Sequence, residues 1–291
     1  MSVAVRQPGP VIESEPIRSR RGIVWQTIKQ RPSATIGAGI LLVVVVCAVL
    51  APWIAPYDPH EQVGPVFGHP SWKHPLGLDD GGIDMVSLLM WGCRISLVVG
   101  FAATFVSMVI GGTVGVAAGY FGGRTDNVLM RITDYFLVIP DVPLMIIVAA
   151  IWGPSLFHIV IVIGILLWTS TARVILRHVL PQVAPLLIAN TVLTIAVAIF
   201  DETALAFLGL GDPSRISLGK VIENAFQRAA ISTGAWWAIV PPGALVAVII
   251  LGCSLLGGAI EDALNPRLRV AHLSARSFKL RPLVGRGPEA V

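Results

Sequence analysis

The sequence has 291 residues, of which 55% are hydrophobic and only 13% are charged, and its mean hydropathy is +0.78. Because a soluble domain carries about 25% charged residues, this composition excludes an ordinary soluble protein and indicates a polytopic membrane protein. The net charge is +4, but the basic residues gather in two tails and in short loops. No basic face is interleaved with aromatic residues, so we expect no nucleic-acid binding.

Residues 1–35 form a basic tail ahead of the first apolar run. Within this tail, residues 18–31 (RSRRGIVWQTIKQR) set Ile23, Trp25 and Ile28 among basic side chains. This pattern predicts an interfacial helix on the inner leaflet, with a disordered basic tail as the alternative. The polar lead is longer than in a usual signal peptide and no A-x-A site follows it, so we expect no cleaved signal.

The charge-free apolar runs predict six membrane helices. A membrane-spanning helix needs about 20 mostly apolar residues, and the turn signal at 152–155 (WGPS) divides one long run into two. The predicted helices lie near residues 36–55, 95–119, 128–150, 157–173, 184–206 and 237–260. Residues 36–260 are therefore predicted to form an all-α, six-span transmembrane domain, followed by a second tail at 261–291.

Positive charge is distributed unevenly between the two sides of these spans. With the N-terminus inside, most of the 21 Lys and Arg residues fall in the two tails and in the inner loops. An excess of Lys and Arg marks cytoplasmic loops, so both termini are predicted to be cytoplasmic. The outer loops at 56–93 and 207–236 are long, which is typical of surfaces that dock partners, whereas the inner loop at 171–183 is short.

The motifs of nucleotide-dependent and hydrolytic enzymes are absent from the sequence. There is no G-x-x-x-x-G-K-[ST] phosphate loop, no dinucleotide-binding G-x-G-x-x-G, no H-E-x-x-H and no G-x-S-x-G. We therefore expect no catalytic residues and no ATP hydrolysis by this chain alone. Cys47, Cys93 and Cys253 show no CxxC spacing, which favours buried thiols over a disulfide framework or a zinc site.

Two patterns predict contacts between or within helices. Gly111, Gly115 and Gly119 repeat every four residues, which permits a neighbouring helix to pack closely against that face. Arg131 and Asp134 lie three residues apart on one predicted helix. They are expected to pair with each other near the inner interface, because residues at this spacing are neighbours on a helix surface.

Three further carboxyl groups lie near or within the predicted spans. A charge at bilayer depth costs about 2.5–3.5 kcal/mol on insertion scales, so it needs a partner or a water-filled path. Asp141 lies between Pro140 and Pro143, which break or kink the helix. It is a candidate for meeting a substrate ammonium, with a capping or structural role as the alternative. Asp201 and Glu202 are candidates for lining an outer vestibule, with simple exposure to water as the alternative. Asp141, Asp201 and Glu202 are thus the predicted residues of a translocation path.

Four ordered stretches resemble one family of transport proteins. Residues 74–100 (HPLGLDDGGIDMVSLLMWGCRISLVVG) resemble H-P-L-G-T-D-x-x-G-R-D-x-x-S-R-x-x-x-G-x-R-x-S-L, and residues 118–134 resemble A-G-Y-x-G-G-x-x-D-x-x-x-M-R-x-x-D. Residues 201–211 and 255–269 are similar to E-A-S-L-S-F-L-G-L-G and to L-G-D-x-L-R-D-x-L-D-P-R-L-R. The chain thus resembles the second permease subunit of binding-protein-dependent ABC importers, in the dipeptide/oligopeptide/nickel branch.

This resemblance implies the ABC importer permease fold and a subunit that moves dipeptides or oligopeptides across the bacterial plasma membrane. The implied partners are a second homologous permease subunit, two cytoplasmic ATPase subunits, an extracytoplasmic substrate-binding protein and the peptide substrate, all within or beside the lipid bilayer. ATP and Mg would bind to the ATPase subunits, so the resemblance implies no cofactor on this chain.

The inner loop at 171–183 departs from the family pattern. Its ends resemble the family sequence, but no E-A-A-x-x-x-G coupling segment lies between them. The residual groups expected to face an ATPase are Arg173, Arg177, His178, Leu180, Pro181 and Gln182. Three explanations stay open: an altered copy with impaired coupling, contact with the ATPase through other inner groups, or loss of a segment from the recorded sequence. A loop this short holds about two turns of helix at most.

Two other functions remain as alternatives. A nickel or other small-solute importer on the same scaffold is favoured by the outer histidines His60, His69 and His74. An uncoupled membrane scaffold or regulatory subunit is favoured by the short inner loop.

Overall fold

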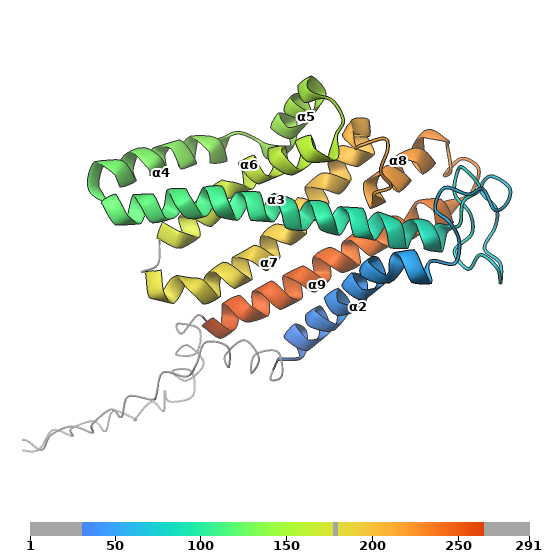
Figure 1. The fold of residues 1–291 in the computed structure, drawn as a ribbon, viewed down its shortest axis with the longest axis horizontal. Helices are drawn as coiled ribbons and strands as arrows, with labels where there is room; N and C mark the ends of the chain where they lie inside the picture. Colours follow the sequence, from blue (N-terminus) through green and yellow to red (C-terminus); the bar gives the residue numbers. More distant parts are fainter. Residues whose placement is uncertain (1–30, 177–179, 265–291) are drawn as a thin grey trace, which may run out of the picture.

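The computed structural model describes residues 31–176 and 180–264, and in these ranges the regular elements are helices (Figure 1). The expected interfacial helix at 18–31 and the tail at 261–291 therefore lie almost wholly outside the described residues. In chain order the elements are α2 (Pro32–Ile54), α3 (Met85–Phe121), α4 (Gly123–Val138), α5 (Asp141–Trp152), α6 (Leu156–Leu176), α7 (Leu180–Leu205), η1 (Ala206–Leu210), α8 (Leu218–Gln227), η2 (Trp236–Ala238) and α9 (Val240–Leu264). Five segments are long and apolar enough to cross a membrane, and α4 with α5 would make a sixth span.

Helix α3 is longer than the sequence predicts. It begins at Met85, where the side chain of Asp84 accepts a hydrogen bond from the backbone N–H of Ser87, and it runs for 37 residues. At 1.5 Å per residue the helix is about 55 Å long, well beyond the ~30 Å hydrocarbon core. Residues 85–93 of the predicted outer loop at 56–93 are therefore helical and form the first turns of α3.

The third predicted span is two helices instead of one. Helices α4 and α5 meet at an angle of 85°, so the predicted continuous helix at 128–150 is wrong. Pro140 explains the break: the residue before a proline avoids helical backbone angles, and Ile139 is extended, with φ −76° and ψ 128°. Pro143 lies in the first turn of α5, where a missing N–H costs nothing.

Helix α3 packs most extensively against α6, through two of the three repeated glycines. A Cβ on Gly111 would lie 2.4 Å from the carbonyl oxygen of Trp168, and one on Gly115 would lie 2.9 Å from the Cβ of Ile175. The predicted close packing is confirmed at these two positions. It is wrong at Gly119, where a Cβ would meet nothing within 4 Å.

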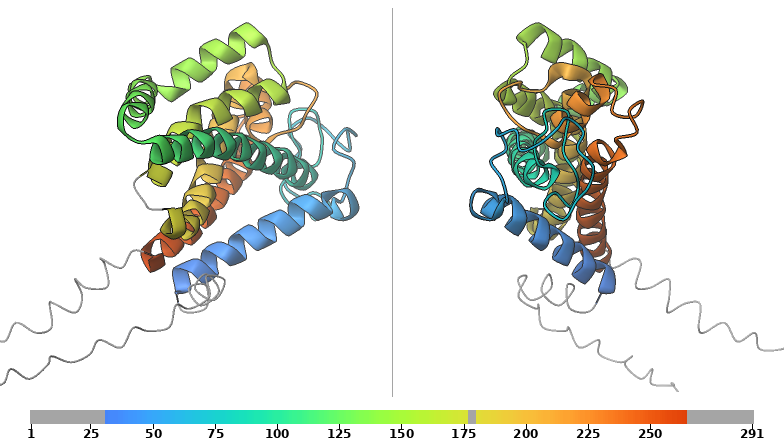
Figure 2. Two further views of the ribbon diagram at one scale, coloured as in Figure 1. Left: turned by 60° about the vertical axis from the view of Figure 1, so that its left-hand side comes forward. Right: turned by 90° about the vertical axis from the view of Figure 1, so that its right-hand side faces the viewer.

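The beginning and the end of the described chain lie on the same face of the bundle. Helix α2 lies along α9, and the start of α2 and the end of α9 lie at the same end of the molecule (Figures 1 and 2). Arg31 and Asp262 form an ion pair there, with 3.0 Å between Nη1 and Oδ2. The first described helix therefore begins, and the last one ends, on the same side of the bundle.

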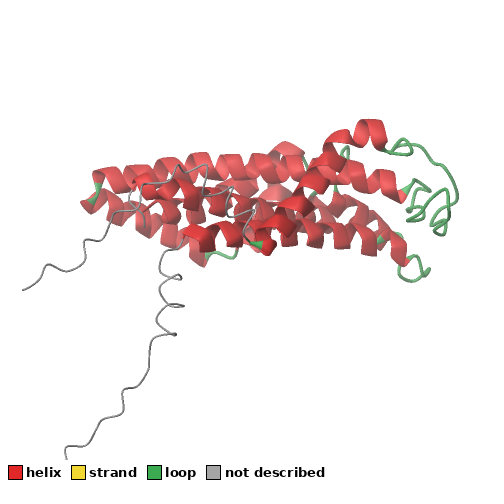
Figure 3. Cartoon of the chain, turned by 90° about the horizontal axis from the view of Figure 1, so that it is seen from below, coloured by secondary structure: helices red, strands yellow, loops and turns green. Residues whose placement is uncertain are grey.

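The long loops gather at the opposite end and form an ordered outer layer (Figure 3). In this layer His74 Nδ1 lies 2.9 Å from Asp84 Oδ1, and the ring of His69 packs on Trp237 with centroids 4.7 Å apart. A cluster of buried side chains, including Met85 and Leu88 of α3 and Val221 of α8, anchors this layer to the helices. The outer loops thus pack against the helices in a defined arrangement.

Candidate functional site

Glu202 on α7 is buried and well supplied with hydrogen bonds. Only 2% of the residue is exposed, and the hydroxyl of Ser96 on α3 donates to its Oε2 at 2.8 Å. The Ser217 hydroxyl also hydrogen-bonds the carboxyl group. Ser96 Oγ in turn accepts from the backbone N–H of Leu218 at 3.4 Å. Through these bonds Glu202 joins α7, α3 and the start of α8.

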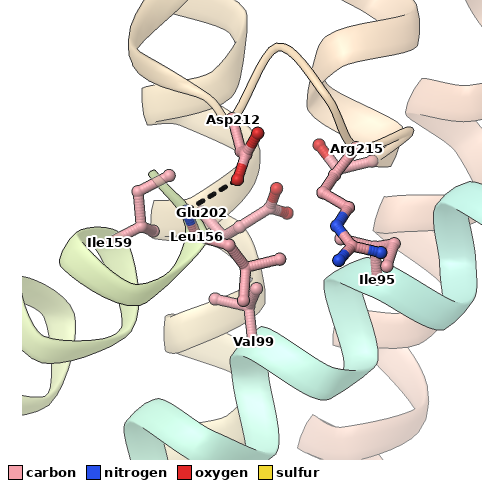
Figure 4. Close-up of a pocket in the computed structure, with 8 residues that line it drawn as sticks. Ile95, Val99, Leu156, Ile159, Glu202, Asp212 and Arg215 are labelled. Carbon is pink, nitrogen blue, oxygen red and sulfur yellow. Dashed lines mark hydrogen bonds between the residues drawn. The ribbon is translucent and has the colours of Figure 1, made fainter. Parts of the chain in front are cut away.

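A small pocket opens beside Glu202 at the outer end of the bundle (Figure 4). Helices α3, α6 and α7 and the segment after η1 supply its lining: Ile95, Val99, Leu156, Ile159, Glu202, Asp212, Arg215 and Ser217. Its interior is roughly the size of one water molecule. A pocket of this size admits no dipeptide, so in this conformation it is a junction between elements.

Asp212 fixes the rim of this pocket. Its Oδ2 accepts a hydrogen bond from the backbone N–H of Leu156 at 3.2 Å (Figure 4), and its Oδ1 accepts from the N–H and hydroxyl of Ser214. Partial burial alone would raise the pKa of Asp212, but these hydrogen bonds and the charge of Arg215 outweigh it and lower the pKa. Asp212 is therefore an ionised link between the start of α6 and the segment that follows η1.

Asp201 precedes Glu202 in the chain but has different surroundings. It is 5% exposed, and its buried Oδ2 has no hydrogen-bond partner among the described residues. Asp141, the first residue of α5, lies near enough to act electrostatically on it. Asp141 and Asp201 thus lie within electrostatic range of each other, whereas the Glu202 carboxyl group is directed toward α3 and the start of α8.

The inner groups predicted to face an ATPase are only partly described. Arg173 on α6 forms an ion pair with Asp134 on α4. The predicted Arg131–Asp134 pair is therefore wrong, because Asp134 turns toward α6 while Arg131 stays exposed on α4. Arg177 and His178 lie outside the described residues. Leu180, Pro181 and Gln182 form the first turn of α7.

The outer histidines do not converge on one another. His74 contacts Asp84 and His69 stacks on Trp237, while the backbone N–H of His60 bonds Asp58. Across residues 31–176 and 180–264 there is no group of three His, Cys, Asp or Glu side chains suited to a metal.

Two residues that were not predicted from the sequence are Ser96, which holds the carboxyl group of Glu202, and Asp84, which holds the ring of His74. The Asp-x-x-Ser spacing at the start of α3 is a helix N-terminus signal that could have revealed Asp84. Of the cysteines, Cys93 and Cys253 are buried free thiols as predicted, and Cys47 is half-buried.

Comparison with known proteins gives matches at both ends of the chain. Residues 19–67 match the family described as the N-terminal TM domain of oligopeptide transport permease C. Residues 169–270 match the family described as binding-protein-dependent transport system inner membrane component.

Three curated relatives have similar lengths of match. The di/tripeptide transport system permease protein DppC of Pseudomonas aeruginosa is 33% identical in an alignment of 282 positions, and the match covers 85% of this chain and 92% of the relative. For the dipeptide transport system permease protein DppC of Haemophilus influenzae, the identity is 32% over 284 positions, and the match covers 84% of this chain and 94% of the relative. For the protein of the same name from Escherichia coli, the identity is 32% over 281 positions, and the match covers 84% of this chain and 92% of the relative.

Proposed function

The chain belongs to the DppC-like permeases of binding-protein-dependent ABC importers, and we propose that it carries dipeptides and other short peptides across the bacterial inner membrane. The observation that carries this proposal is the match to peptide permeases along most of the chain. Permeases of this family are multi-pass inner-membrane components without catalytic activity. They bind no cofactor, because ATP is consumed by the partner ATPase subunits, and a binding protein delivers the substrate.

We further propose that this subunit forms half of the path, beside a second homologous permease subunit, with one ATPase under each half. The pocket among α3, α6 and α7 is supporting evidence, since it has room for about one water molecule and a dipeptide needs far more space. We place a path of peptide width on a face of this bundle that a second subunit would cover. Asp141 and Asp201 would line that path, while Glu202 would support its outer end.

The termini are proposed to be cytoplasmic. The Arg31–Asp262 ion pair brings the start of α2 and the end of α9 to one face, and the excess of Lys and Arg in the tails and short loops favours the cytoplasm for that face. Tags at the two ends should both be protected in right-side-out vesicles and accessible in inverted ones. Accessibility of either tag in right-side-out vesicles would contradict this orientation.

We also propose that the chain lacks the E-A-A-x-x-x-G segment through which its family contacts the ATPase. Only residues 177–179 separate α6 from α7 in the sequence. The alignment with the Pseudomonas relative has 282 positions, but it contains only 85% of this chain's 291 residues. The alignment therefore has more positions than this chain has residues to fill them. The relative therefore has stretches without a counterpart here, which supports a missing segment. Coupling to the ATPase would be impaired, or would depend on other inner groups such as Arg173.

The test is a reconstituted importer containing the partner permease, both ATPases and the binding protein. Peptide-loaded binding protein is expected to stimulate ATP hydrolysis weakly with the chain as it stands. It is expected to stimulate strongly after the coupling segment of a relative is inserted behind Arg173. Equal stimulation of the two complexes would show that no coupling contact is missing. An uncoupled scaffold, favoured by the same short connection, would give no peptide uptake with either version.

A further inference from the structure

Asp201 is the one described carboxyl group on α7 with an unused, buried oxygen. It is 5% exposed and its Oδ2 has no hydrogen-bond partner in the described residues. Burying a polar group without a partner is unfavourable relative to leaving it in water, and burying an ionised carboxylate is more unfavourable still. The neighbouring Glu202 is equally buried but accepts hydrogen bonds from Ser96 and Ser217. Asp201 Oδ2 can therefore accept a hydrogen bond from a further donor.

A second carboxyl group, on another helix, lies within electrostatic range of Asp201. Helix α5 packs against α7 and η1, and Asp141 at its first position acts electrostatically on Asp201. Asp141 is exposed, and it follows the break at Ile139 and Pro140 that separates α4 from α5. The ion pairs of the described residues involve other carboxyl groups, so neither Asp141 nor Asp201 is neutralised by a described basic side chain.

We infer that Asp141 and Asp201 together bind the α-ammonium group of a peptide in transit, a conclusion that rests on the proposed function. An ammonium group has three N–H donors and no acceptor. It can therefore donate to Asp201 Oδ2 on α7 and to the Asp141 carboxylate on α5 at the same time. Charge-assisted hydrogen bonds of this kind are about twice as strong as neutral ones.

The chemistry favours an ammonium group over a metal cation. A calcium ion needs about six to eight oxygen ligands, and the described residues offer no group of three ligating side chains. The α-ammonium is also the cationic group that peptides share whatever their side chains. The pair would thus bind the N-terminus of any peptide without selecting among its side chains.

The experiment measures occupancy of the pair directly in the complete importer in nanodiscs. Dicyclohexylcarbodiimide modifies protonated carboxyl groups in apolar surroundings, and mass spectrometry of the digested chain reports modification of Asp201. Ala-Ala at about ten times its Kd is expected to slow this modification about tenfold. N-acetyl-Ala-Ala, which lacks the ammonium group, is expected to leave the rate unchanged.

Two variants complete the design. Asp141→Asn should remove most of the protection by Ala-Ala. Glu261→Gln, which changes an exposed carboxyl group near the end of α9, should preserve it. Equal protection by both peptides, protection by neither, or full protection in Asp141→Asn would overturn the inference. ATP-driven uptake of Ala-Ala by the same complex separates the two proposals: uptake without ammonium-specific protection removes this site alone, and absence of uptake removes the proposed function.

Discussion

Replacing Gly111 by alanine tests how closely α3 and α6 pack. The new Cβ would lie 2.4 Å from the carbonyl oxygen of Trp168 and 2.8 Å from the Cβ of Thr171, and real Cβ atoms essentially never approach such atoms within 3.0 Å. The contact is with backbone, which has no flexible end to move away. The helices would have to separate by at least about 0.6 Å over this turn.

The magnitude follows from two opposing effects. Overpacking a closely fitted contact costs about 1–3 kcal/mol, while replacing glycine by alanine inside a helix gains up to about 1 kcal/mol. Gly119→Ala is the matched control, because Gly119 lies on the same helix and in the same glycine repeat, but no atom lies within 4 Å of the new Cβ. The helix gain is common to both variants, so Gly111→Ala should be less stable than Gly119→Ala by about 1–3 kcal/mol.

Equilibrium unfolding of the purified subunit in mixed detergent micelles, followed by tryptophan fluorescence, measures this difference. Gly115→Ala should fall between the other two variants, since its Cβ would meet Ile175 Cβ at 2.9 Å and Ala172 O at 3.0 Å. Equal stabilities of the Gly111 and Gly119 variants would show that the α3–α6 contact is looser than described here.

Three further changes have distinct expected results. Ser96→Ala removes a donor to Glu202 and should lower the free energy of unfolding by about 1–3 kcal/mol; a loss under about 0.5 kcal/mol would show that the bond is dispensable. Burial raises the pKa of Asp79 from 3.8 to about 6, so the folded state binds this proton more tightly than the unfolded state. Stability should therefore fall as pH rises between those two values, and Asp79→Asn should flatten that slope in a pH series of thermal unfolding; an unchanged slope would contradict this. Asp262→Asn breaks an exposed ion pair with Arg31 and should cost less than about 1 kcal/mol in the same unfolding assay, a larger loss indicating a structural clamp.

The sequence predicted the long apolar helices well because their signal is local. Helices α2, α6, α7 and α9 overlap the predicted spans closely, since an uninterrupted apolar run of membrane length has few other solutions. The start of α3 was missed because Arg94 interrupts the charge-free run. In the structure Arg94 stays exposed and stacks over the ring of Trp91, so its charge does not end the helix.

The contacts between helices could not be read from the chain. Spacing favoured a pair between Arg131 and Asp134, but the side to which Asp134 turns depends on where α6 lies, and it pairs with Arg173. Asp201 and Glu202 are adjacent in the sequence, and both carry a carboxyl group. On a helix they point about 100° apart, and only the fold decides that Glu202 meets hydroxyl groups while an oxygen of Asp201 meets none.

The most direct test of the account is ATP-driven uptake of radiolabelled Ala-Ala into proteoliposomes that contain the complete importer. The account predicts uptake that requires both ATP and the binding protein, slow with the chain as it stands and faster once a relative's coupling segment is inserted behind Arg173. Proteoliposomes that accumulate no peptide with either version, although the complex assembles, would contradict it.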